Sequence, residues 1–196
     1  MITVIQKNYT APPINQKQIL RYLNCAVSKD ETQKLVNECL SQFCGEAVYK
    51  VCYIELPVCV SDSVCDFGAF AVKSKDLAKN LNGCKSVIIF SATIGIGVDR
   101  LINKYSRISP AKAVVLDAIG SERIEALCDR FCSDIKAQIG NLKPRFSAGY
   151  GDLPIETQKK IFSLLQCDKK IGLTLNDSYM MSPSKSVTAF VGIFND

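Results

Sequence analysis

A polar, turn-forming run from Lys143 to Pro154 carries the side chains best suited to chemistry. Arg145 offers a planar cation with a fork of donors, and Tyr150 offers an aromatic ring with a polar tip. Gly149 and Gly151 permit positive φ angles or the close approach of a ligand to the backbone. Structured loops of this length are usually functional. The run is therefore predicted to be a recognition loop.

Two helical patterns flank this loop. A long helix is predicted over residues 110–139, beginning at Pro110 and ending at Gly140, with a kink expected near Gly120. A short amphipathic helix is predicted after Pro154, with its apolar positions at Ile155, Ile161, Phe162, Leu164 and Leu165. The long helix delivers the chain to the loop, and the loop runs into the start of the short helix.

The remaining elements are helices early in the chain and strands spread along it. The order favours an α+β fold with a mainly antiparallel sheet. The patterns predict helices over 16–24, 30–43 and 74–81 and a strand over 47–60 broken at Pro57. They also predict a hairpin or a second short strand within 61–74, a buried strand over 86–93, a helix after Gly97 and a closing strand that ends near Gly192.

Composition is that of a globular protein. With 196 residues, 47% of them hydrophobic and 22% charged, the chain is expected to form one domain over 1–196, with an extended arm at 1–14 and the motif segment at 143–192. The net charge of +5 comes from scattered lysines, which indicates a solvated surface and no nucleic-acid partner. No apolar run is long enough for a membrane helix and no secretory leader is visible, so we expect a cytoplasmic protein.

The chain has ten cysteines and no histidine. No Cys-x-x-Cys pair occurs, and zinc sites that need histidine are excluded, so no metal site is expected. Reduced core thiols are the favoured interpretation, with an oxygen-poor habitat or an unrecognised cluster site as alternatives. Cys128 and Cys132 lie one turn apart on the predicted long helix.

Two further patterns are weak. Gly95 and Gly97 follow a buried strand, but Arg100 stands where a dinucleotide-binding fingerprint needs its last glycine, so a strand-to-helix turn is the simpler interpretation. Ser182 and Lys185 have acyl-enzyme spacing, but Pro183 disfavours the helix that this motif needs, and a ligand-facing or partner-facing loop is the better interpretation.

The segment from Arg145 onward resembles the S-adenosylmethionine-binding activation domain of cobalamin-dependent methionine synthase. The resemblance covers roughly the last quarter of the chain strongly and extends more loosely back to about Ser86. It is carried, in fixed order, by Arg145, Gly149-Tyr150, Pro154, Leu175-Asn176-Asp177-Ser178, Met181, Pro183 and Ser186-Val187.

This resemblance implies a curved antiparallel sheet flanked by helices, with S-adenosylmethionine as the ligand. Arg145 would hold the methionine carboxylate, and the main chain near Arg145 and Asp152 would contact the adenosine end. Gly149 belongs to the same ligand-binding motif, and Tyr150 would lie beside the activated methyl group and the upper face of the corrin. An acid on the long helix would face the ligand, with Glu125 preferred to Glu122. The family motif Cys-Pro-Asp-His is replaced here by Leu-Pro-Ile-Glu.

The resulting hypothesis is a stand-alone activation subunit that supports the reductive methylation of a Co(II) corrinoid. The chain has no Asp-x-His-x-x-Gly motif, so cobalamin would come from a partner, a corrinoid-binding methionine synthase or related methyltransferase. A flavodoxin or ferredoxin would supply the electron. The chain would thus be an accessory subunit. Two alternatives remain, a binding or scaffold protein that keeps the fold without the ligand and a thiol-based redox protein.

Overall fold

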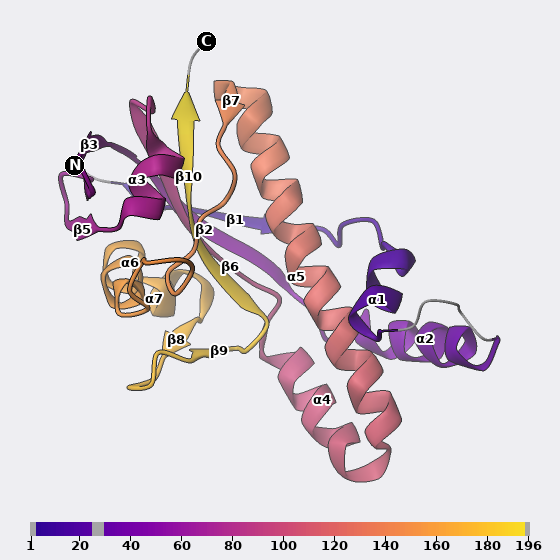
Figure 1. Cartoon of the computed structure of the whole chain (residues 1–196). Coiled ribbons are helices and arrows are strands. Elements are labelled where there is room, and N and C mark those ends of the chain that lie inside the picture. The colour runs from indigo at the N-terminus through magenta and orange to yellow at the C-terminus, as the bar shows by residue number, and fades with distance from the viewer. Residues whose placement is uncertain (1–2, 25–29, 195–196) are drawn as a thin grey trace.

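The computed structural model describes residues 3–24 and 30–194, which form a central sheet with helices on both faces (Figure 1). In chain order the elements are β1 (Ile5–Tyr9), α1 (Gln16–Tyr22), α2 (Asp30–Phe43), β2 (Tyr49–Pro57), β3 (Cys59–Ser61), β4 (Val64–Asp66), β5 (Ala71–Lys73), α3 (Lys75–Leu81), β6 (Ser86–Thr93), α4 (Ile96–Ile108), α5 (Pro110–Ile139), β7 (Asn141–Leu142), α6 (Thr157–Leu165), α7 (Cys167–Ile171), β8 (Thr174–Leu175), β9 (Met181–Ser182) and β10 (Ser186–Phe194).

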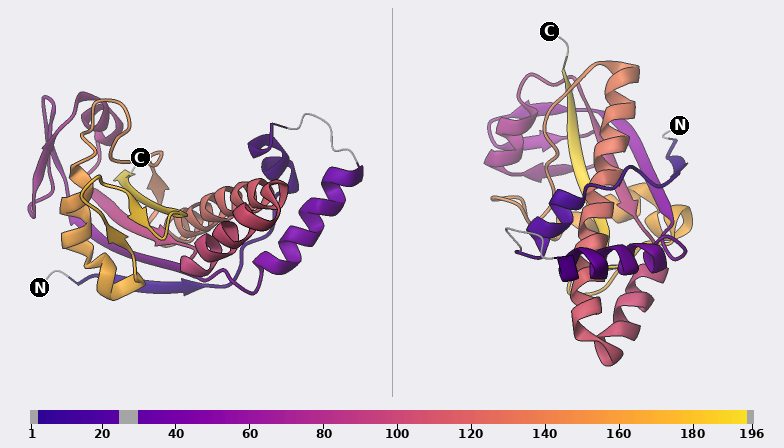
Figure 2. Two further views of the ribbon diagram at one scale, coloured as in Figure 1. Left: turned by 90° about the horizontal axis from the view of Figure 1, so that it is seen from below. Right: turned by 90° about the vertical axis from the view of Figure 1, so that its right-hand side faces the viewer.

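The main sheet has five strands in the order β1-β2-β6-β10-β7, and every neighbouring pair is antiparallel. Its strands curve across the molecule (Figure 2). The central strand β6 is buried along nearly its whole length, which explains its apolar run from Val87 to Phe90. The prediction of a strand over 86–93 is confirmed, as is the α+β class with a curved antiparallel sheet.

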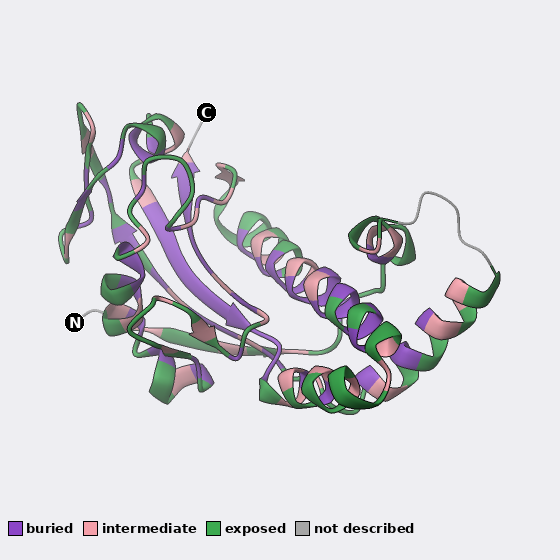
Figure 3. Cartoon of the chain, turned by 60° about the horizontal axis from the view of Figure 1, so that its bottom comes forward, coloured by how far each residue is buried: buried purple, intermediate pink, exposed green. Residues whose placement is uncertain are grey.

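Alternate residues of each strand point to opposite sides of the sheet. Helices cover both of these faces, so the molecule has a hydrophobic core on each side of the sheet. One face, which includes Val51, Phe90 and Val191, packs against α5, and α1, α2 and α4 pack on α5 in turn. The other face, which includes Ile89 and Phe190, lies under α3, α6 and α7. Figure 3 shows the buried strands between these layers, with exposed residues on the outer sides of the helices.

Two small sheets lie at the margins. Strands β3, β4 and β5 form a three-stranded antiparallel sheet, and β8 pairs with β9 as a two-stranded hairpin. The backbone N–H of Ser74, just before α3, donates to the carbonyl of Ser63 at 2.8 Å. The start of α3 is therefore attached to the three-stranded sheet.

Helix α5 runs for 30 residues, and Gly120 lies within it without ending it. A helix of this length spans about 45 Å. The structural role of Gly120 is to leave space for Lys185, because a Cβ there would lie 3.1 Å from carbons of the Lys185 side chain. Glycine thus allows the Lys185 side chain to cross the helix closely.

Helix α7 was not predicted. It is five residues long, too short to show helical periodicity in a sequence. Gln166 and Gly172, both in the left-handed region with φ of 50° and 70°, lie at its two ends. Within the described ranges, no helix combines the length and apolar character needed to cross a bilayer.

Candidate functional site

The predicted recognition loop runs beside the edge of β10. The backbone N–H of Lys143 donates to the carbonyl of Gly192 at 2.8 Å, and Phe146 and Phe190 exchange two backbone hydrogen bonds of 2.8 and 2.9 Å. Since successive residues of an extended segment point to opposite sides, Phe146 enters the core beside Phe190 and Arg145 lies on the side of α5. The pairing with β10 therefore orients Arg145.

Arg145 is surrounded by acids of α5. Its Nη2 lies 2.8 Å from Oε2 of Glu125 and 3.0 Å from Oδ1 of Asp129. Its other terminal nitrogen, Nη1, is buried and has no hydrogen-bond partner in the described part of the chain. The sequence predicted that Arg145 and Glu125 share one site, and the structure brings them together. Asp129 was missed, although its spacing of four residues from Glu125 places both on one helix face.

Lys185 reaches the same side of α5 from the loop before β10. Its Nζ lies 2.8 Å from Oδ1 of Asp117 and 3.0 Å from Oγ of Ser121. Asp117, Ser121, Glu125 and Asp129 follow each other at four-residue intervals and form one polar stripe along α5. Two cations therefore meet this stripe: Lys185, from the loop before β10, and Arg145, from the segment that pairs beside β10.

The two candidate acids, Glu122 and Glu125, have different surroundings. Glu122 is 2% exposed and forms an ion pair with Arg123, whose guanidinium donates to the carbonyls of Pro12 and Pro13 at 2.5 and 2.7 Å. Glu122 also accepts the backbone N–H of Asn15 at 3.0 Å. This pair holds the N-terminal arm against α5, whereas Glu125 keeps its carboxylate at Arg145.

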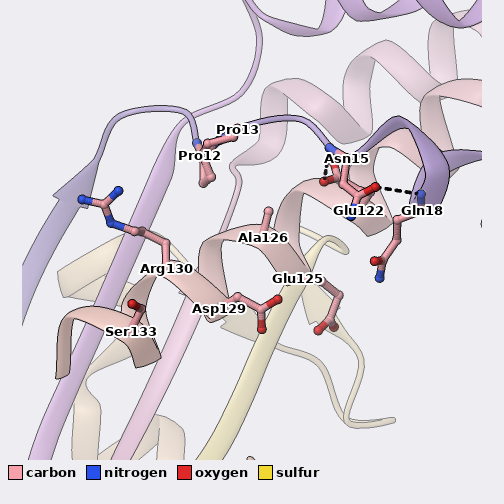
Figure 4. A pocket seen from close by; sticks show the side chains of 10 residues that line it. All are labelled: Pro12, Pro13, Asn15, Gln18, Glu122, Glu125, Ala126, Asp129, Arg130 and Ser133. Atoms are coloured by element: carbon pink, nitrogen blue, oxygen red, sulfur yellow. Dashed lines mark hydrogen bonds between the residues drawn. The ribbon is translucent and has the colours of Figure 1, made fainter. Parts of the chain in front are cut away.

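A hollow of about 330 Å³ lies between the N-terminal arm and α5 (Figure 4). Glu125 and Asp129 lie on its α5 side, and Asn15 lies opposite on the arm. Its lining consists of Pro12, Pro13, Asn15, Gln18, Glu122, Glu125, Ala126, Asp129, Arg130 and Ser133. The acids that meet Arg145 are thus open to a cavity large enough for part of a small molecule.

Tyr150 lies on the other side of the loop. Tyr150 is 71% exposed, and its ring meets the ring of Phe146 edge-on with a centroid separation of 5.7 Å. It borders a second hollow, of about 540 Å³, which Arg145 does not line. The residues around this hollow are Asp76, Lys79, Asn80, Lys143, Pro144, Phe146 and Tyr150.

The two loop glycines adopt positive φ angles, +84° at Gly149 and +56° at Gly151. A side chain at Gly149 would collide with Ile155, and one at Gly151 would collide with the carboxylate of Asp76. Asp152 directs its carboxylate toward α3, where it accepts the backbone N–H of Lys75 at 2.7 Å. The loop is therefore closely packed against α3.

The cysteines are spread over many elements of the fold. Each of the nine cysteines in the described residues is free, and Cys25 lies outside them. Burial raises the pKa of the Cys128 thiol and raises that of Cys132 to about 11, so both stay protonated at neutral pH. No group of three or more His, Cys, Asp or Glu side chains in those residues is placed to hold a metal ion.

Comparison with known proteins decides the family. The family model described as "Vitamin B12 dependent methionine synthase, activation domain" matches residues 73–195. The chain belongs to this family. The resemblance seen at Arg145, Gly149-Tyr150 and the later motif elements is confirmed.

A solved structure of the family supports the fold over more of the chain. The MetH reactivation domain, crystallised with AdoHcy, matches with a TM-score of 0.72 and 14% sequence identity. The match covers 97% of this chain and 78% of that one. A search of curated proteins found no match. The activation-domain fold therefore includes the N-terminal arm and helices as well as the motif segment.

Proposed function

We propose that this activation-domain chain binds S-adenosylmethionine and supports the reductive methylation of a Co(II) corrinoid. The observation that carries the proposal is the position of Arg145, which β10 orients toward Glu125 and Asp129 of α5. Glu125 and Asp129 line a cavity, and Arg145 contacts both of them without lining it. The match to a MetH domain crystallised with AdoHcy supports a ligand of this class.

The charges suit the amino-acid end of the ligand, which carries a carboxylate and an ammonium group. The buried Nη1 of Arg145 has no partner in the described part of the chain, and a carboxylate would give it one. Glu125 and Asp129 would receive the ammonium group, which favours Glu125 over the occupied Glu122 as the ligand-facing acid. A zwitterion would thus exchange partners with an existing ion pair, and no charge would be left unpaired.

The loop would present the other end of the ligand. S-adenosylmethionine supplies the methyl group, and the corrinoid supplies the cobalt that accepts it once reduced. The main chain near Arg145 and Asp152 would contact the adenosine, and the positive φ of Gly149 would give the loop the shape for this contact. Tyr150 has most of its ring exposed, so it can lie against the upper face of a corrin without leaving the core. Its part is positioning.

The corrinoid would be bound outside these 196 residues. The chain has no histidine to serve as a lower ligand, and the proposed partner is a corrinoid-binding methionine synthase or related methyltransferase. An external flavodoxin or ferredoxin would donate the electron. The chain would then act as an accessory subunit that positions the methyl donor.

Two measurements test this function. Calorimetry with S-adenosylmethionine should show saturable binding to the purified protein. When the protein is mixed with a Co(II) corrinoid protein, a low-potential reductant and S-adenosylmethionine, the visible spectrum should show faster methylation than without it. Absence of binding would favour a scaffold that keeps the fold without the ligand. Binding without acceleration for any corrinoid protein tested would refute the activation role.

A further inference from the structure

Asp152 joins the recognition loop to a helix that lies far away in the sequence. Its carboxylate accepts the hydroxyl of Ser74 and the backbone N–H groups of Lys75 and Asp76, the latter two at 2.7 and 3.2 Å. Ser74 also accepts the backbone N–H of Leu77 at 3.0 Å. Asp152 and Ser74 together therefore satisfy the backbone donors in the first turn of α3. We call the contacts of the Asp152 carboxylate with Ser74, Lys75 and Asp76 the α3 latch.

The attachment is reciprocal. The backbone N–H of Asp152 donates to the carboxylate of Asp76 at 3.3 Å. Gly151 packs so closely on that carboxylate that a Cβ would displace it. The amide of Asn80 donates to the carbonyl of Pro144 at 3.2 Å. Helix α3 thus contacts the loop on both sides of Tyr150 in the sequence.

Apart from α3, the loop is held by backbone hydrogen bonds within its own turn and by the buried side chain of Leu153. Gly149 and Gly151 remove the side chains that restrict backbone angles. Inside the turn, Gly149 donates to Leu153 at 2.9 Å, and both Tyr150 and Leu153 take part in backbone hydrogen bonds of 3.1 Å. Phe146 sets one end of the loop through β10, but it lies four positions before Tyr150. A second anchor on the far side of Tyr150 would restrict both ends.

We propose that Asp152 is a positioning residue, whose α3 latch holds the loop in the conformation that binds S-adenosylmethionine and presents Tyr150. This inference rests on the proposed function. It assigns the Asp152 carboxylate to α3 and not to the ligand. Ser74 belongs to the same latch, because its hydroxyl donates to the Asp152 carboxylate and accepts the backbone N–H of Leu77 in α3.

The electrostatics of the latch are consistent with this role. The Ser74 hydroxyl, followed by the Lys75 amide, lowers the pKa of the Asp152 carboxyl below its usual value. The carboxylate is therefore charged at neutral pH and accepts charge-assisted hydrogen bonds, which are stronger than neutral ones.

Hydrogen exchange tests the latch without any ligand. In Asp152→Ala, the backbone amides of residues 149–153 should exchange about tenfold faster than in the parent, as expected for the loss of a charge-assisted anchor. Asp66→Asn is the matched control, because Asp66 also accepts a backbone N–H, that of Gly68 at 2.8 Å, in a turn of the small sheet. Unchanged exchange at 149–153 in Asp152→Ala would refute the latch.

Ser74→Ala gives a second, independent measurement. If Ser74 and Asp152 act through one contact, the double variant should raise loop exchange no further than the larger single variant, and additive effects would contradict a shared latch. Should Asp152→Ala fail to fold, Asp152→Asn keeps the shape of the side chain and removes its charge. It should raise loop exchange by a smaller factor, and no rise would again refute the proposal.

Calorimetry then connects the latch to the ligand. S-adenosylmethionine should bind Asp152→Ala roughly three- to tenfold more weakly than the parent, because the loop must be ordered on binding. The Asp66→Asn control should bind as the parent does. Faster loop exchange with unchanged affinity would show a latch that does not position the ligand, and would overturn the inference. If the parent itself does not bind, the proposed function fails, and the exchange data still decide whether the latch exists.

Discussion

The two sides of the recognition loop are built in different ways. On the α5 side, Arg145 is held by opposite charges from one long helix. On the α3 side, Tyr150 is exposed, and the loop beside it is held by hydrogen bonds to backbone groups. A charged cluster suits the capture of a charged ligand, whereas an exposed ring on an anchored loop suits contact with a second molecule. We therefore expect capture and presentation to be separable by mutation.

The largest effect is expected at the base of the α5 side. Arg123→Leu should lower the free energy of unfolding by about 3–5 kcal/mol, because it leaves Glu122 buried without its partner. It also removes the donors that hold Pro12 and Pro13. Chemical denaturation with urea measures the change. Replacement of the exposed Arg107 by alanine is the control and should change stability little.

Tyr150→Ala should separate the two sides most clearly. Its affinity for S-adenosylmethionine should stay near that of the parent, since an aromatic face contributes only about 0.5–2 kcal/mol to a nearby cation. The rate of corrinoid methylation should fall on the order of a hundredfold, the usual cost of a misplacement of about 1 Å at reacting atoms. Calorimetry and the spectroscopic assay together measure both quantities. A methylation rate equal to that of the parent would show that Tyr150 has no part in presenting the methyl group.

Arg145→Ala, unlike Tyr150→Ala, should act mainly on the affinity for S-adenosylmethionine. Loss of a charge-assisted contact should weaken binding of S-adenosylmethionine by about 1.5–3 kcal/mol. The fold should survive, because the pairing of Phe146 with Phe190 uses the backbone alone. Calorimetry gives the affinity, and Arg107→Ala is again the control. A variant that binds as tightly as the parent would show that the carboxylate of the ligand lies elsewhere.

The smallest effect on the site is expected from the thiols behind Arg145. Conversion of Cys128 and Cys132 to alanine should cost about 1–2 kcal/mol of stability from lost packing, with ligand affinity unchanged. Denaturation and calorimetry measure the two quantities. Tightly bound iron or another metal in parent protein purified without oxygen, absent from the double variant, would instead indicate a cluster site.

The long elements were predictable because residues buried on one face recur at regular spacing in the sequence. The strand Ser86–Thr93 and the helix Pro110–Ile139 have their predicted bounds, since each buries many apolar residues. The site was only partly predictable. Periodicity places Glu122 and Glu125 on one helix but does not say which of them an N-terminal arm will occupy.

Contacts between distant segments left no trace in the sequence. Ser74 and Asp152 meet through the sheet and the helices packed on it, and nothing in either local pattern indicates the other. Arg145 and Tyr150 likewise share a motif, but Arg145 meets the acids of α5 whereas Tyr150 borders a hollow that Arg145 does not line. Local sequence identifies the chemical groups, whereas their division between two surfaces depends on how the loop pairs with β10.

The place of β10 in the chain has a kinetic consequence. This strand follows every other element, yet it inserts beside β6, where Ser186 pairs with Thr93 and Ile193 with Ser86. Contacts between such distant segments form slowly, because a long stretch of chain must be closed first. Until β10 docks, Phe146 has no strand to pair with and Arg145 has no fixed direction. The ligand site should therefore be among the last parts of the molecule to form during folding, and the unpaired edge of β6 would until then be the surface most exposed to aggregation.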